Sequence, residues 1–124
     1  MGRAGTGAGV GGRSFAIVRS ADVPAGGGPH PAGSPYDRHL SAHLGIEDFG
    51  LYEVVLPPGG STVPHDHLAD AVEDAYVVVR GSGWLVVDGE ETPLTVGQVV
   101  AVTKESRRHV RAGADGCTLI AVCA

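Results

Sequence analysis

The chain has 124 residues and a formal net charge of −5, with 9 basic and 14 acidic side chains. This length suits one domain with a buried core, and the lack of a basic run argues against a nucleic-acid-binding surface. No apolar stretch approaches the length of a membrane span and the first residues lack the apolar core of a signal peptide, so we expect a cytoplasmic protein without membrane contact.

The front of the chain differs in composition from the rest, because half of the 20 glycines and half of the eight prolines precede residue 36. We expect residues 1–13 to form a disordered glycine-rich tail and residues 14–124 to form a single domain. Residues 14–19 predict a short edge strand, and the proline-rich residues 24–35 predict an extended loop in which His30 is exposed. The apolar residues 15–18 have no obvious partner within a small domain, so we expect them to pair with a second copy in a homodimer.

The middle and end of the chain read as short strands separated by turns. Residues 36–45 indicate either one helical turn or a short strand. The predicted strands that follow are residues 49–56, 61–67, 74–80, 84–88, 91–94, 99–103, 108–112 and 117–123. Asp88-Gly89 is a strong hairpin signal, and residues 113–116 predict another turn. Regularly spaced strands without an amphipathic helix predict an antiparallel sandwich or barrel.

His65 and His67 are the strongest candidates for chemistry. On a strand, residues two apart project from the same face, so the two imidazoles can supply neighbouring ligands to a divalent cation. Taken alone, the His-Asp-His sequence would also fit a polar turn. Among the acidic residues that follow, alternation places Asp74 on the same face as Tyr76 and places Glu73 on the other. We therefore expect Asp74, rather than Glu73, to be the third ligand.

The order of these residues resembles the first motif of the cupin family, and the resemblance covers roughly residues 45–123. Gly59 precedes His65 by five intervening residues, His67 follows, and an acid and an apolar strand lead to Gly81. The loop after His67 is longer than in the family pattern, which puts Asp74 in place of the family's glutamate. The resemblance implies an all-β, antiparallel jelly-roll barrel, or double-stranded β-helix. It also implies one divalent transition metal ion, which could be Fe, Mn, Ni or Zn.

The second cupin motif departs from the pattern, because Arg108 stands where the family has a histidine and His109 comes one residue late. Alternation with Val110 predicts that Arg108 faces inward and His109 outward, unless a bulge just before them shifts the register and makes His109 a fourth ligand. A buried arginine needs a partner. The partner could be Asp74 or an anionic substrate, or the side chain could extend to the rim of the barrel.

The resemblance implies a small metal-dependent enzyme that acts on a small anionic or aromatic metabolite by dioxygenase, isomerase, cyclase or lyase chemistry. We expect Arg108 to bind a carboxylate of this small-molecule substrate and Tyr76 to act as the proton donor. The alternative is a non-catalytic ligand-binding or sensing cupin with a degenerate metal site. The replacement of glutamate by Asp74 and of histidine by Arg108 favours this alternative.

Overall fold

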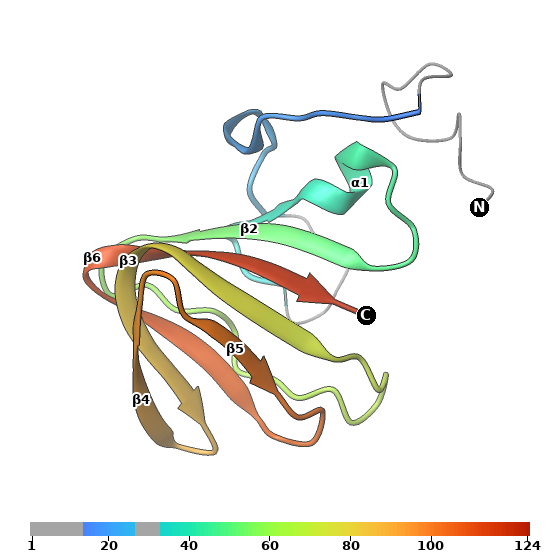
Figure 1. The fold of residues 1–124 in the computed structure, drawn as a ribbon. Helices are drawn as coiled ribbons and strands as arrows, with labels where there is room; N and C mark the ends of the chain where they lie inside the picture. Colours follow the sequence, from blue (N-terminus) through green and yellow to red (C-terminus); the bar gives the residue numbers. More distant parts are fainter. Residues whose placement is uncertain (1–13, 27–32) are drawn as a thin grey trace.

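The computed structural model describes residues 14–26 and 33–124, and its regular elements are almost all strands (Figure 1). In chain order they are the 3-10 helix η1 (Ser20–Asp22), β1 (Asp37–His39), α1 (Leu40–Leu44), β2 (Gly50–Leu56), β3 (Asp74–Val87), β4 (Glu90–Thr95), β5 (Val99–Val102) and β6 (Arg108–Cys123). The tail predicted over residues 1–13 and the exposed position predicted for His30 lie outside the described residues. Within the described residues, no helix is long and apolar enough to span a membrane.

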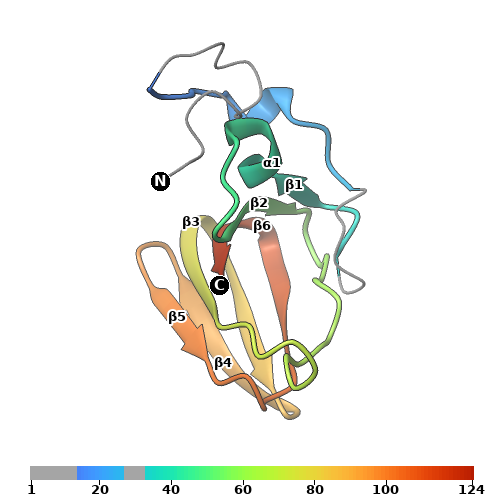
Figure 2. The same ribbon diagram turned by 90° about the vertical axis from the view of Figure 1, so that its right-hand side faces the viewer.

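The strands form one antiparallel sheet in the order β1-β2-β6-β3-β4, and β5 pairs separately with the first part of β3. The register of β3 against β6 runs from Asp74 opposite Cys123 to Val87 opposite Arg108. Figure 2 shows the sheet curving so that β2, β3 and β6 surround a common interior. The predicted all-β, antiparallel barrel is therefore confirmed.

Two pairs of predicted strands are in fact single long strands. Residues 74–80 and 84–88 both belong to β3, and residues 108–112 and 117–123 both belong to β6, so the turn predicted at 113–116 is wrong. The pairing shifts register on both sides of Arg80–Gly81 without breaking. Gly81 has a φ of 73°, and a Cβ there would collide with the carbonyl oxygen of Gly116. The glycines therefore allow two strands to bend closely past each other, which is what β-bulges do.

Other sequence predictions are met in part. Residues 36–45 contain both of the expected alternatives, the strand β1 and the short helix α1, which ends at Gly45 with a φ of 71°. The hairpin predicted at Asp88 joins β3 to β4, with φ values of 49° for Asp88 and 85° for Gly89. Residues 61–67 are extended, but they contact β6 through only two isolated bridges rather than as a regular strand.

The core lies on the inward faces of β2, β3 and β6. Val54, Val78, Val110 and Leu119 are each at most 5% exposed. Alternate positions of β3 from Asp74 to Val78 are buried, and Arg108 and Val110 are likewise buried on β6. Two charged side chains therefore share the inward face with the apolar core, and this placement determines the candidate site.

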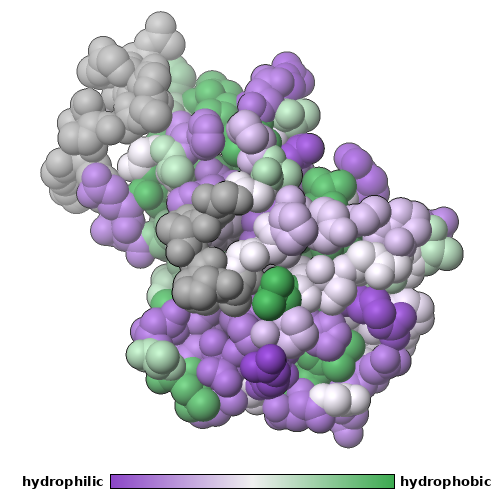
Figure 3. Space-filling model, turned by 180° about the vertical axis from the view of Figure 1, so that it is seen from behind, coloured by the Kyte–Doolittle hydropathy of each residue, from purple (hydrophilic) through white to green (hydrophobic). Residues whose placement is uncertain are grey.

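The strand predicted at residues 14–19 is not formed, because this segment is extended without a strand partner among the described residues. Phe15 and Ile17 are 57% and 83% exposed. On the face shown in Figure 3, apolar residues otherwise form small patches separated by hydrophilic ones.

A homodimer therefore stays a prediction, in which Phe15 and Ile17 lose their exposure against a second copy. Light scattering at micromolar concentration should give twice the mass of the chain. The double variant Phe15→Ser and Ile17→Ser should give the mass of a monomer. A monomeric mass for the unaltered protein would contradict the prediction.

Candidate metal centre

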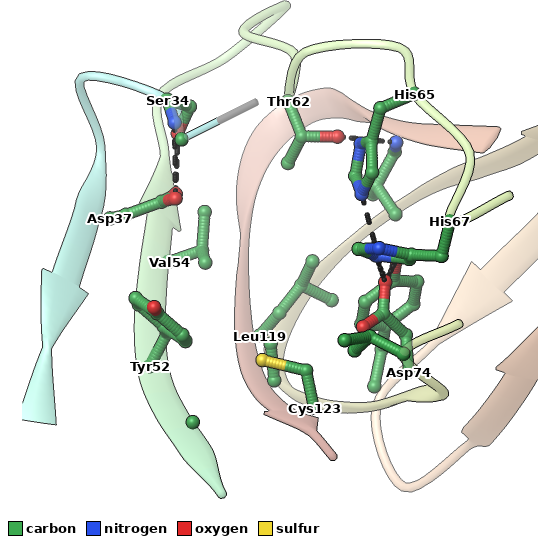
Figure 4. A pocket seen from close by; sticks show the side chains of 16 residues that line it. Ser34, Asp37, Tyr52, Val54, Thr62, His65, His67, Asp74, Leu119 and Cys123 are labelled. Atoms are coloured by element: carbon green, nitrogen blue, oxygen red, sulfur yellow. Dashed lines mark hydrogen bonds and ion pairs between the residues drawn. The ribbon is translucent and has the colours of Figure 1, made fainter. Parts of the chain in front are cut away.

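His65, His67 and Asp74 offer three ligand atoms that all lie within 4.8 Å of one another. The two histidines come from the extended segment that bridges to β6, and Asp74 is the first residue of β3. Figure 4 shows both imidazoles beside the Asp74 carboxylate. His67 and Asp74 are buried, and His65 is partly exposed. The structure thus brings together the three residues that alternation predicted.

Both imidazoles are held so that their Nε2 atoms face Asp74. Nδ1 of His67 lies 2.9 Å from Oδ1 of Asp70, and its Nε2 lies 2.9 Å from Oδ2 of Asp74. Nδ1 of His65 lies 2.8 Å from the carbonyl oxygen of Val63, and its Nε2 lies 3.7 Å from the same Asp74 oxygen. Metal-binding histidines typically have their outer nitrogen fixed by a carboxylate or carbonyl in this way. The donor set and its orientation therefore fit a divalent transition metal ion.

Arg108 is fully buried behind this group. Its Nη1 donates to Oδ2 of Asp74 at 2.7 Å, its Nη2 to the carbonyl oxygen of Thr103 at 2.6 Å, and its Nε to that of Ser106 at 3.0 Å. Of the two partners considered for Arg108, the structure shows Asp74. The rim position is wrong, because the side chain is 0% exposed. The guanidinium is also not part of the cavity wall, so the structure does not support direct contact with a substrate carboxylate.

The contacts at Asp74 determine which groups carry protons. Burial alone would raise the pKa of the Asp74 carboxyl, but the interactions with His65, His67 and Tyr76 outweigh it and lower the pKa. The hydrogen bond to Asp74 is the main reason that the pKa of His65 is raised, against the effect of burial. The Asp74 carboxyl is therefore ionised at neutral pH.

Tyr76 lines the cavity, and its hydroxyl donates to Oδ2 of Asp74 at 3.0 Å. Burial and the neighbouring Asp74 charge together raise the pKa of the phenol far above its ordinary value. Tyr76 therefore keeps its proton at neutral pH. Its proton is donated to Asp74, so the role of Tyr76 as a proton donor stays a prediction.

His109 and Glu73 do not join the group. The backbone N–H groups of His65 and Arg108 each donate to the carbonyl oxygen of the other residue, which fixes the register of this part of β6. Arg108 and Val110 face inward, so His109 lies on the opposite face. The bulge that would have made His109 a ligand does not occur. Glu73 is exposed and pairs through its backbone with the last residue of the chain.

His65, His67 and Asp74 line one end of a cavity of about 300 Å³. Much of the wall is apolar and comes from Val54, Val72, Val110, Leu119 and Ala121. Figure 4 shows Ser34, Asp37 and Tyr52 on the side opposite the histidines, with Cys123 below. Ser34 and Asp37 could not be identified as cavity residues from sequence, because no motif marks them. The inward position of Cys123 could have been found by alternation with Leu119 and Ala121.

Comparison with known proteins places the chain in a family. The sequence model of the cupin domain matches residues 52–123, which is more than half of the chain. The chain therefore belongs to the cupin family. No curated protein sequence matches it.

Solved structures share the fold. A cupin protein from Bacteroides fragilis is 21% identical, with a TM-score of 0.65, over 71% of this chain and 75% of that one. A sugar phosphate isomerase of the cupin superfamily from Silicibacter pomeroyi is 23% identical, with a TM-score of 0.64, over 71% of this chain and 57% of that one. A Cupin 2 conserved barrel domain protein from Salinispora arenicola is 26% identical, with a TM-score of 0.53, over 62% of each chain. The match thus spans less than two thirds of the last two proteins.

Proposed function

We propose that the chain binds one divalent transition metal ion through His65, His67 and Asp74 and acts, in the cytoplasm, as a small metal-dependent enzyme. The observation that carries the proposal is the orientation of the two imidazoles, whose outer nitrogens are fixed and whose Nε2 atoms face one carboxylate. Two histidines and one carboxylate with open positions suit Fe(II), and Mn(II), Ni(II) or Zn(II) can use the same donors.

The residues around the three proposed ligands have different roles. A bound ion would supply Lewis-acid chemistry at an oxygen of the substrate. Arg108 and Tyr76 hold the Asp74 carboxylate in place through contacts of 2.7 and 3.0 Å. The apolar wall limits the access of water to the substrate, which strengthens electrostatic interactions in the site.

The charge of the site favours an anionic group on the substrate. Arg108 already balances the charge of Asp74, so the protein would leave the charge of a divalent ion uncompensated. A carboxylate or enolate oxygen would supply the missing negative charge. The structural neighbour described as a sugar phosphate isomerase is consistent with a small anionic substrate. Its resemblance to this chain shows the fold, and the substrate class remains part of the proposal.

The alternative function is a non-catalytic ligand-binding cupin. The observation that favours it is the complete burial of Arg108, whose guanidinium is bonded to Asp74 and two carbonyl oxygens. The ion pair between Arg108 and Asp74 could by itself stabilise the buried Asp74 carboxylate without a metal. The two functions differ in whether the purified protein takes up an ion.

Metal titration tests the proposal. Protein stripped with a chelator should bind one Co(II) per chain at pH 8 and show the visible absorption of a low-symmetry nitrogen and oxygen site. Fe(II), Mn(II), Ni(II) and Zn(II) should compete for the same site. Binding of Co(II) should weaken as the pH is lowered, because His65 must release its proton first. Failure to bind any of these ions would leave only the non-catalytic alternative.

A further inference from the structure

Asp37 faces the cavity from the side opposite the metal centre (Figure 4). It lies on β1 and is paired in register with Val54 of β2, whose side chain also lines the cavity. The carboxylate is anchored by Ser34, whose backbone N–H donates to Oδ2 at 3.0 Å and whose hydroxyl donates to Oδ1 at 2.5 Å. The side chain is therefore fixed at a defined place on the wall.

No cationic side chain among the described residues forms an ion pair with Asp37. The next residue, Arg38, pairs instead with Glu53 at 3.2 Å. An ionised carboxylate can accept about four hydrogen bonds, and Ser34 supplies only two. Asp37 therefore offers the cavity an uncompensated negative charge with unused acceptor positions.

The charge of Asp37 contributes to the raised pKa values of two other cavity residues, Tyr52 and Cys123. Burial is the main cause of the raised pKa of Tyr52, and the charges of Asp37 and Asp74 add to it. Burial likewise raises the pKa of Cys123 to about 11, with contributions from Asp74 and Asp37. Both groups stay protonated at neutral pH. Near Asp37 the cavity thus combines a carboxylate with neutral groups, and Arg108 is not part of its wall.

We propose that Asp37 determines substrate specificity by binding a protonated amine, while an anionic oxygen of the same molecule occupies the metal end. The ligand class is a short zwitterion with an apolar spacer, because the wall between the two ends is largely apolar. A cavity of about 300 Å³ limits it to a small metabolite. This inference rests on the proposed function for the position of the anionic end.

Matched pairs of small acids test the assignment by calorimetric titration of the zinc-loaded protein. The probes are 4-aminobutanoate with pentanoate, 5-aminopentanoate with hexanoate, and 6-aminohexanoate with heptanoate, so that each pair exchanges an ammonium for a methyl group. At least one amino acid should bind about tenfold or more tightly than its partner, as expected for a charged hydrogen bond. Asp37→Asn should remove this preference. Asp22→Asn, which neutralises an exposed carboxylate outside the cavity, should keep it.

Several results would overturn the assignment: no preference at any length, no binding of any probe, or a preference that survives in Asp37→Asn. Should Asp37→Asn fail to fold, Asp37→Glu decides, because its extra methylene should shift the optimum to a shorter amino acid. An unchanged optimum contradicts the role of Asp37. The same titrations on chelator-stripped protein separate the two proposals. If the protein prefers amino acids but takes up no metal, the role of Asp37 is supported and the proposed metal site is rejected. If it takes up zinc but shows no preference for amino acids, the metal site is supported and the role of Asp37 is rejected.

Discussion

Replacing Arg108 with methionine should lower the free energy of unfolding by about 3–5 kcal/mol, the usual cost of removing one partner from a buried ion pair. The Asp74 carboxylate would lose its 2.7 Å contact with Nη1. Two carbonyl oxygens, those of Thr103 and Ser106, would lose their donors as well. Urea denaturation of the metal-free protein measures the change directly.

Arg111→Met is the matched control, because Arg111 lies on the same strand but at the surface. It pairs with Glu91 at 2.8 Å and lies 4.4 Å from the ring centre of Trp84. Exposed pairs of this kind contribute about 0–1 kcal/mol. Combining Arg108→Met with Asp74→Asn should recover part of the loss, because neither charge is then left alone. Equal costs for Arg108→Met and Arg111→Met would contradict the structural role given to Arg108.

The inward position of Arg108 could be predicted from sequence because alternation along a strand is a local property. The same rule favoured Asp74 over Glu73 as the residue beside His65 and His67, and it placed His109 outward unless a bulge shifted the register. It could not identify the partner of Arg108, since Asp74 is 34 residues away in the chain. The contact with Asp74 shows that the arginine positions this carboxylate.

Sequence-based prediction was less accurate at glycines and where segments far apart in the chain come together. Glycines such as Gly81 and Gly116 resemble turns in sequence, but here they allow β3 and β6 to bend past each other in close contact. Asp37 follows a stretch of sequence rich in proline, and it lines the cavity because β1 pairs with β2. No local sequence pattern indicates that Asp37 lines the cavity, so this second polar end could be found only from the structure.

Replacing both His65 and His67 with alanine should abolish metal binding and leave the barrel folded. Two of the three ligands would be lost, so the loss of affinity should far exceed the roughly 10–100-fold typical of changing an outer-shell partner. Asp70→Asn supplies that smaller effect for comparison, because the Asp70 carboxylate contacts the outer nitrogen of His67 and not its metal-facing nitrogen. The core residues on β2, β3 and β6 are untouched, so the circular dichroism spectrum should not change.

His109→Ala is the decisive control for the double histidine variant. It removes an imidazole from the opposite face of β6, outside the group of three ligand residues. Cobalt titration should therefore give one ion per chain for His109→Ala, a weaker site for Asp70→Asn, and none for the double variant. Loss of the ion from His109→Ala would mean that the register of β6 beside His65 differs by one residue. Arg108 would then point outward, and its substitution by methionine would cost little stability.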